Sequence, residues 1–453
     1  MSRLKFALWG MLLLSSAASA EQTYDLGDFA KLSVFGFIKV EGYRNTNQSE
    51  GLVNCGYTSD PRGVFGTYCQ PGPAKTASPT PMDLEQLGGA LSHEFDSAWK
   101  VDARLSYRMR NGYPDIVGEP LVEGNVAVSH PRYGELRGGT MLSRSWTRSD
   151  SFSYPLGMST AWSESGAGYS LFKKAIRYSG PMLEFDGGRK LLLEATLATN
   201  DIHYAQSAPT VTYNQAPPRP KLWEIFAQYA DSANLVEYVF QKSRGGQQSS
   251  WAKGPFIGDV GNADGLGITP SAPPGAYTLP TENVHILQGD HYFNPSWKGT
   301  LGMRRNSWSG AAYQCDYVVG TGCYFPSGFN NGEPGTPDNI AHAAWSVDMM
   351  GGITNYQGLW TYYAGFVRYN KAYTSTPTEY GQSNSATYIN LGINRRVPEV
   401  YKNLQVYAGL GQVRFGRYGP APMSMPSELA FFGVDPRSHS FATLLTVGTG
   451  LTF

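Results

Sequence analysis

The segment KVDARLSYRMR, residues 100–110, alternates apolar and polar side chains over its whole length. Its apolar positions are Val101, Ala103, Leu105, Tyr107 and Met109, and its polar positions are Lys100, Asp102, Arg104, Ser106, Arg108 and Arg110. Successive side chains of a β-strand point to opposite faces, so this pattern predicts a strand with one apolar face and one charged face. Residues 96–98 form a predicted reverse turn to a partner strand over 87–95.

The same two-strand unit recurs along the chain, and about 16 strands are predicted in all. The predicted strands are 31–44, 87–95, 100–110, 121–129, 133–142, 171–178, 189–199, 222–229, 234–242, 284–293, 298–305, 341–350, 359–369, 387–395, 404–414 and 441–453. The long connections, rich in Gly, Pro, Ser and Asn, are roughly 45–82, 111–118, 143–168, 201–220, 245–283, 307–339, 371–385 and 416–438. They alternate strictly with short turns.

Strands of this length cross a bilayer when tilted, and a β-structure can span a bilayer only as a closed cylinder. Long connections on one side and short turns on the other are the plan of an outer-membrane barrel, whereas a soluble sandwich or propeller does not require that alternation. The sequence therefore predicts an all-β, transmembrane antiparallel β-barrel of about 16 strands, with long extracellular loops and short periplasmic turns, as a single domain over 21–453.

Residues 1–20 have the three parts of a secretory signal. Arg3 and Lys5 precede an apolar stretch, and the segment ends in the small residues Ala18, Ser19 and Ala20. The apolar stretch is about half the length that a membrane-anchoring helix needs, so removal of the segment is expected.

Charge and composition exclude several classes of protein. The 36 basic and 36 acidic residues balance, which leaves no basic footprint for nucleic acid. Charged residues are 16% of the chain, against about 25% in soluble proteins, while 41% of residues are hydrophobic and able to form a folded structure. On the predicted strands the sparse charges fall on one face, which is expected to line the interior of the barrel.

The last predicted strand carries the most specific signal. Phe441, Thr443, Leu445, Val447 and the terminal Phe453 share one face of it. Together with the opening strand VFGFIKV at 34–40 and the segment YGELRGG at 133–139, it resembles the general bacterial (Gram-negative) outer-membrane porin family. In outer-membrane barrels a C-terminal aromatic residue after alternating hydrophobics is the recognition signal for assembly, so the resemblance implies that the barrel-assembly machinery reads Phe453.

The resemblance further implies a homotrimer in the bacterial outer membrane, in contact with membrane lipid and lipopolysaccharide; the charge balance already speaks against a nucleic-acid partner. It also implies that the third long loop, 143–168, folds into the interior as a constriction opposite basic residues of the wall. The implied pore-lining and constriction residues are Arg104, Arg108, Arg110, Arg137, Arg144, Arg148, Asp150 and Glu164. The loop departs from the family pattern because it carries two arginines beside only two acids.

We hypothesise that Arg104, Arg108 and Arg110 favour anions in the interior, the alternative being that they are solvated wall charges without control of selectivity. The expected function is a porin for passive diffusion of small hydrophilic solutes and ions. The alternatives are a substrate-selective porin for sugars, oligosaccharides or anions, with 16 or 18 strands, and a barrel adhesin or structural protein. Solute identity, cation or anion preference and the faces that form the trimer interface stay open.

The cysteines form two local pairs, Cys55 with Cys69 and Cys315 with Cys323, each inside one predicted long loop. An exported chain can keep such disulfides, and the local pairing is favoured among three connectivities because different loops need not meet. No Cys-x-x-Cys or His-x-x-x-His spacing indicates a metal site. No nucleophile elbow, phosphate-binding loop or nucleotide fingerprint is present, so neither enzymatic activity nor a cofactor is expected.

Overall fold

We describe the fold from a computed structural model of the chain. The structure describes residues 22–27, 30–45, 48–49, 52–59, 65–71, 74–75, 80–110, 113–114, 120–147, 171–199, 221–244, 281–309, 317–319, 322–324, 343–370, 373–374, 385–416 and 441–453. The predicted signal segment 1–20 lies outside these residues.

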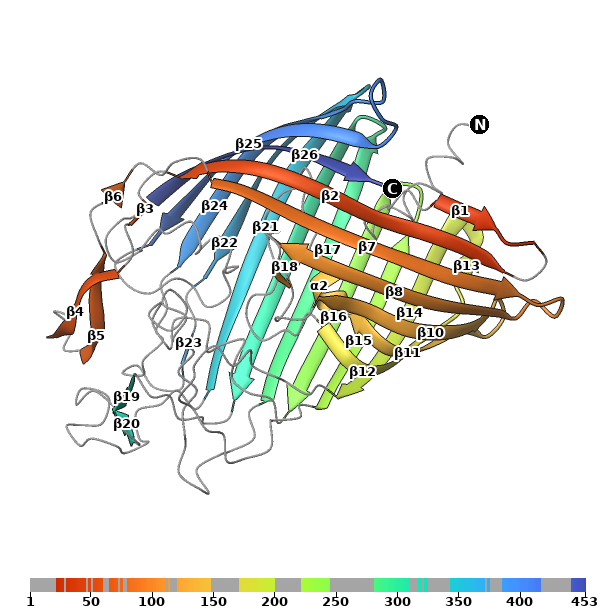
Figure 1. The fold of residues 1–453 in the computed structure, drawn as a ribbon, viewed down its shortest axis with the longest axis horizontal. Helices are drawn as coiled ribbons and strands as arrows, with labels where there is room; N and C mark the ends of the chain where they lie inside the picture. The colour runs from red at the N-terminus through yellow and green to blue at the C-terminus, as the bar shows by residue number, and fades with distance from the viewer. Residues whose placement is uncertain are drawn as a thin grey trace.

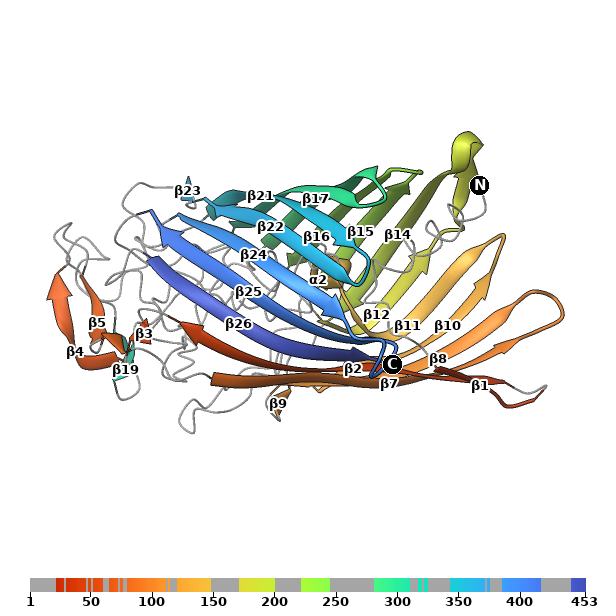
Figure 2. The same cartoon turned by 90° about the horizontal axis from the view of Figure 1, so that it is seen from above.

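Sixteen antiparallel strands form a closed barrel (Figures 1 and 2). In order around the ring, they are β2 (Lys31–Asn45), β7 (Thr80–Glu94), β8 (Lys100–Arg110), β10 (Leu121–His130), β11 (Gly134–Leu142), β12 (Leu171–Ser179), β14 (Arg189–Thr199), β15 (Lys221–Ala230), β16 (Asn234–Arg244), β17 (Thr281–Asn294), β18 (Trp297–Ser309), β21 (Ala343–Gln357), β22 (Trp360–Tyr369), β24 (Ala386–Arg396), β25 (Leu404–Phe415) and β26 (Phe441–Thr452). Each strand pairs with the next, and β26 pairs with β2, which closes the ring. The predicted fold class and strand number are confirmed.

Short elements add to this plan. The barrel strands are extended at their ends by β1 (Gln22–Asp25), β9 (Tyr113–Pro114), β13 (Leu183–Phe185) and β23 (Tyr373–Thr374). Small hairpins and turns within the connections are β3 (Gln48–Ser49) with β6 (Ala74–Lys75), β4 (Leu52–Ser59) with β5 (Phe65–Pro71), β19 (Tyr317–Val319) with β20 (Gly322–Tyr324), the helix α2 (Arg144–Thr147) and the 3-10 turn η2 (Asp186–Gly188). The segment 143–168, predicted only as a loop, thus begins with a helical turn.

The two faces of the wall differ as the alternation predicts. Leu105 and Tyr107 of β8 stand on the outer surface, about half exposed, whereas Asp102 and Ser106 of the same strand are buried on the inner side. Leu197 and Leu301 are the extreme cases of the outer surface, with 69% and 73% of their area exposed. An outer surface covered by such residues is stable only against hydrocarbon or another protein surface, so the barrel is built to span a membrane.

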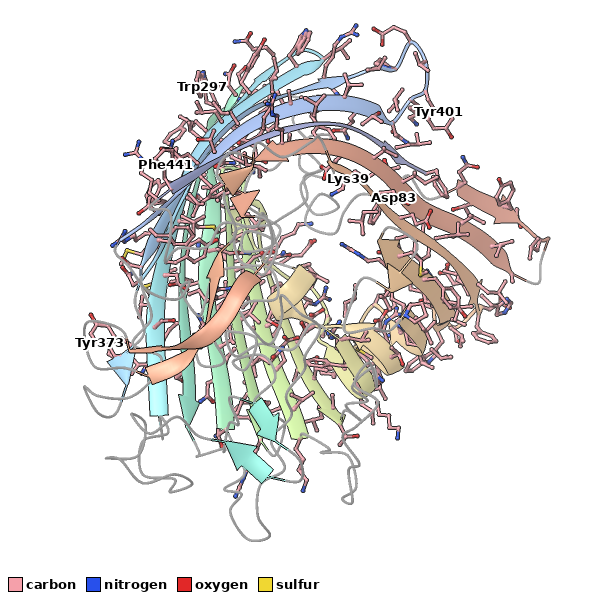
Figure 3. The ribbon with its side chains drawn as sticks, turned by 60° about the vertical axis from the view of Figure 1, so that its left-hand side comes forward. Lys39, Asp83, Trp297, Tyr373, Tyr401 and Phe441 are labelled. Atoms are coloured by element: carbon pink, nitrogen blue, oxygen red, sulfur yellow. The ribbon has the colours of Figure 1, made fainter. Side chains whose placement is uncertain are left out.

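Aromatic side chains lie on the outer surface at both ends of the barrel. At the short-turn end Trp297 and Trp360 are exposed, and at the opposite end Trp345 stacks on Tyr373 with ring centroids 4.5 Å apart. Figure 3 shows Trp297 and Phe441 on the outside, while Lys39 points into the enclosed space. Such belts mark the two membrane–water interfaces.

The seam of the barrel lies where the chain ends. Gly36 of β2 and Phe453 form a pair of backbone hydrogen bonds, with the Gly36 N–H donating at 2.8 Å and the Phe453 N–H donating at 3.0 Å. Beyond Phe453, the same edge of β2 is taken by β1, in which Gln22 lies opposite Val34. The strands β26 and β1 therefore pair one after the other with the same edge of β2.

Inward aromatic rings lie flat over glycines of the neighbouring strand. A Cβ atom placed on Gly392 would overlap the Tyr363 hydroxyl, and one on Gly448 would lie 2.5 Å from the Tyr407 hydroxyl oxygen. Gly411 accommodates Tyr388 in the same way. Because the rings lie along the wall rather than across the barrel, they bury their surface without filling the interior.

Candidate functional site

The inner wall of β8, β10 and β11 carries a charged cluster around Arg137. Its Nη2 lies 3.0 Å from Asp102 Oδ1, its Nε lies 2.9 Å from Glu135 Oε1, and its Nη1 donates to Asn125 Oδ1 at 2.5 Å. Arg104 Nε lies 3.6 Å from the same Asp102 oxygen. These groups follow directly from strand parity, because registered neighbours of β8, β10 and β11 face the same side.

Two arginines of β8 are held over phenylalanines of β2. The guanidinium carbon of Arg104 lies 5.3 Å from the ring centroid of Phe35, and that of Arg108 lies 5.4 Å from the ring centroid of Phe37. Phe35 reaches β8 by crossing Gly88 of β7, where a Cβ would come within 2.5 Å of the ring. The Arg104 side chain keeps 35% of its area exposed, so it presents positive charge to the interior.

The helix α2 turns inward directly after β11 and is fixed by Arg144. The Arg144 guanidinium donates to both oxygens of Glu194 on β14, through Nε at 2.5 Å and Nη2 at 2.7 Å, and it lies 5.3 Å from the ring centroid of Phe226. Burial lowers the pKa of Arg144, but the carboxylates of Glu194 and Glu224 outweigh that effect and raise it. The residue is therefore a permanent cation that ties the start of the third long connection to the wall.

Glu224 of β15 holds the backbone of the same helix. Its Oε1 accepts the Arg144 N–H at 2.7 Å, and its Oε2 accepts the Ser145 N–H at 3.0 Å. Gln241 of β16 donates to Glu224 at 3.1 Å and to the Ser145 hydroxyl at 2.7 Å. The Glu224 carboxylate thus binds the backbone N–H groups in the first turn of α2, which have no acceptor within the helix.

Further ion pairs lie on other parts of the inner wall. Arg177 of β12 donates to the Thr196 hydroxyl at 2.9 Å and lies 3.7 Å from Glu224. Arg304 of β18 lies 3.3 Å from Asp348 of β21, and both side chains are almost fully buried. The interior is consequently polar and charged, in contrast to the outer surface.

One inner contact depends on closure of the ring. Lys39 of β2 lies 3.7 Å from Glu41 of the same strand, and the Tyr407 hydroxyl of β25 donates to Glu41 at 2.5 Å. Tyr407 and Glu41 are 366 residues apart in the chain. They meet because β26, which lies between them, pairs with β2.

The structure places several predicted site residues on the inner wall and leaves others undescribed. Arg104, Arg108 and Arg137 face inward, and Arg110 occupies an inward register position opposite the buried Leu84. Arg144 also lies inside, where it pairs with Glu194. Arg148, Asp150 and Glu164 lie outside the described residues, so the predicted opposition of loop acids and wall arginines stays a prediction.

Several inward charges that form ion pairs on the wall were not among the predicted site residues, including Arg177, Arg304 and Asp348. Arg177, Arg304 and Asp348 have the inward parity of their strands, and the alternation that identified Arg104 could have identified them. Which of these charges pair with one another has no comparable sequence signal, because the two partners of each pair lie on different strands.

The predicted disulfides remain predictions. In the β4–β5 hairpin the backbone register places Cys55 opposite Cys69. Cys315 lies outside the described residues, and Cys323 is on β20. In the part of the chain that the structure describes, no three His, Cys, Asp or Glu residues gather as a metal site. Within the same residues, no helix has the length and apolar character that crossing a membrane requires.

No family model matches the chain, and no curated protein sequence matches it. Solved structures share its fold. An in-vitro folded, trimer form of OmpT, an outer membrane protein of Vibrio cholerae, is similar with a TM-score of 0.56 at 10% identity, over 94% of this chain and 100% of that chain. The anion-selective porin from Comamonas acidovorans gives 0.51 at 12% identity, over 94% and 100%.

OmpF of Salmonella typhi, in a complex with daunomycin, is similar with a TM-score of 0.50 at 11% identity, over 95% of this chain and 100% of that chain. At such identities the likeness establishes the fold and nothing finer. The match covers nearly all of both chains. The chain has the closed sixteen-stranded fold of bacterial outer-membrane porins, as its sequence resemblance to that family predicted.

Proposed function

We propose that the protein is an outer-membrane porin, whose interior passes small hydrophilic solutes and ions by passive diffusion. The observation that carries the proposal is the contrast between the two faces of a closed sixteen-stranded wall, apolar outside and charged inside. A barrel of this size is too wide for its inward side chains to fill and encloses an aqueous channel. The proposal includes no chemical reaction and no cofactor.

We further propose that the functional unit is a homotrimer, like the trimer form of OmpT to which the chain is similar. The short-turn end, which carries Phe453, would face the periplasm and the long connections would face outward. Recognition of Phe453 by the barrel-assembly machinery is part of the same proposal. Its support is the place of Phe453 in the seam, opposite Gly36.

Planar-bilayer recording of the purified protein tests the proposal. We expect stable, ohmic channels that open without an added ligand and close in three equal steps. Saturable block by a sugar or an anion would instead favour the substrate-selective alternative. Folded protein that inserts into the bilayer without measurable conductance would contradict the channel proposal and favour an adhesive or structural role.

We also propose that Arg104 and Arg108 bias the channel toward anions, a preference for which the anion-selective porin from Comamonas acidovorans provides a precedent in this fold. Neutralising both, as Arg104→Gln with Arg108→Gln, is expected to lower the anion-to-cation permeability ratio about twofold per charge. The reason is that a unit charge roughly 8 Å away in water favours an anion and disfavours a cation by about 0.5 kcal/mol each, a difference that about 0.1 M salt screens to roughly half. Reversal potentials across a salt gradient measure the ratio.

The control removes the charges of Arg305 and Arg368, which share the outer face of their strands with the exposed Met303 and Phe366. Arg305→Gln with Arg368→Gln is expected to leave the ratio unchanged. Equal reversal potentials for the inner double variant and the unchanged protein would assign Arg104 and Arg108 to the wall without a role in selectivity.

A further inference from the structure

The side chain of Phe35 on β2 extends along the inner wall toward β8. In the register Phe35 is directly opposite Gly88 of β7, and Gly88 is opposite Ser106 of β8. A Cβ atom on Gly88 would lie 2.5 Å from the Phe35 ring and 2.7 Å from the Ser106 Cβ, so the ring crosses β7 only because no side chain is present there. Phe35 is also buried, which keeps the ring in this place.

Arg104 of β8 lies against this ring. Its guanidinium carbon is 5.3 Å from the ring centroid of Phe35, within the range of a cation–π interaction. The residues opposite Arg104 in the register, Ala90 on β7 and Asn125 on β10, are uncharged. Because an aromatic ring has no net charge, Phe35 holds the guanidinium in place without cancelling its charge.

Asp102 is the carboxylate beside Arg104, and another arginine binds it more closely. The Arg137 Nη2 lies 3.0 Å from Asp102 Oδ1, whereas the Arg104 Nε lies 3.6 Å from the same oxygen. The second distance exceeds a hydrogen bond, and within the residues that the structure describes the Arg104 Nε has no hydrogen-bond partner. A small movement of the Arg104 guanidinium toward Asp102 would therefore complete an ion pair.

Two other inner arginines show the result of such pairing. Arg144 donates to both oxygens of Glu194, and Arg304 lies 3.3 Å from Asp348. A cation paired at these distances acts on a passing ion together with its carboxylate, so the two contributions largely cancel. The Arg104 side chain instead keeps 35% of its area exposed and has no carboxylate at hydrogen-bond distance.

We propose that Phe35 is a positioning residue for ion selectivity, which holds Arg104 away from Asp102 so that the charge of Arg104 acts on ions in the channel. The inference rests on the proposed role of Arg104 in anion preference. Its consequence is that removal of an uncharged side chain changes the selectivity of the channel as if a positive charge had been removed.

Reversal potentials across a salt gradient, recorded in planar bilayers, test the inference. Phe35→Leu is expected to lower the anion-to-cation permeability ratio about twofold, as far as Arg104→Gln does. The two substitutions together are expected to lower it no further, because both remove the same interaction. Phe35→Tyr keeps the ring and is expected to keep the ratio. In an Asp102→Asn background, which lacks the competing carboxylate, Phe35→Leu is expected to leave the ratio unchanged.

Phe172→Leu is the control. Phe172 of β12 is a buried phenylalanine that packs with Met141, Ala175 and Leu222, and its replacement is expected to leave the ratio unchanged. Migration without heating on a denaturing gel shows whether each variant is folded. Phe35→Met, which also lacks the ring, serves if Phe35→Leu does not fold.

The outcomes separate this inference from the proposals beneath it. An unchanged ratio in folded Phe35→Leu or Phe35→Met, or an equal loss in the Asp102→Asn background, would overturn the role of Phe35 and leave the channel proposal intact. An unchanged ratio in Arg104→Gln would overturn the anion preference of Arg104 and this inference with it. Folded protein without conductance would contradict the channel proposal itself.

Discussion

Replacing Gly392 with valine is expected to destabilise the barrel by about 3–5 kcal/mol, so that most of the molecules fail to fold in an assembly assay. The Tyr363 ring of β22 crosses β24 directly above this glycine, and its hydroxyl would overlap the new Cβ. The tyrosine is 6% exposed, so it has little room to move. Overpacking alone costs about 1–3 kcal/mol, and displacing a buried ring adds to that cost. Refolding into detergent or lipid and the fraction of heat-modifiable protein measure the effect.

Two variants show whether the ring contact is the cause. Gly42 of β2 has open space where a side chain would start, with no heavy atom within 4 Å of the position that a Cβ would take, so Gly42→Val is expected to fold normally. Combining Gly392→Val with Tyr363→Ala removes the clash and is expected to recover part of the stability. Normal folding of Gly392→Val by itself would show that the ring is not held over the glycine.

Replacing Glu224 with alanine is expected to detach the helix α2 from the wall and to raise the conductance of the channel. The Glu224 carboxylate accepts the backbone N–H groups of Arg144 and Ser145 and is 1% exposed. Its loss also leaves Arg177 without a nearby carboxylate oxygen at 3.7 Å. Removing one partner of such a buried charged group costs about 3–5 kcal/mol, and a four-residue helix has no stability of its own.

Single-channel recording in planar bilayers measures this effect, as a higher mean current with larger fluctuations of the open level. Glu237→Gln is the control, because Glu237 is an equally buried glutamate of the inner wall that accepts hydrogen bonds from Gln228 and Gln288. It is expected to keep the original conductance. An unchanged current in folded Glu224→Ala would mean that α2 does not narrow the channel.

The strands were largely predictable because each one has apolar side chains on its outer face and polar side chains on its inner face, which gives a regular alternation in the sequence. The strand at 100–110 has the predicted bounds, and so has the strand at 189–199. The strand predicted to begin at 87 begins at Thr80. The prediction missed its first residues because Asp83 and Glu85 face outward, where the alternation leads one to expect apolar side chains. The strand predicted to end at Met350 continues to Gln357 through a Gly-Gly pair, which carries no alternation.

The candidate site was predictable only one strand at a time. Parity placed Arg104, Arg108 and Arg137 inside, but the partners of inward charges depend on how strands are brought together in space. Arg144 meets Glu194 across 50 residues, because α2 bends back onto β14 and β15. No spacing within the chain encodes that contact.

If residues 1–20 are removed as predicted, the seam brings the two ends of the remaining chain close together. Phe453 lies opposite Gly36 and Gln22 opposite Val34, so β26 runs head-to-tail into β1 along one edge of β2, with a separation of about 7 Å along that edge. A linker of a few residues would close the backbone into a ring, and new ends could then be cut at a short turn such as the one between β21 and β22. In such a circular permutant the closing strand would no longer be the last one synthesised, which separates the role of its sequence in assembly from the role of its position at the chain end.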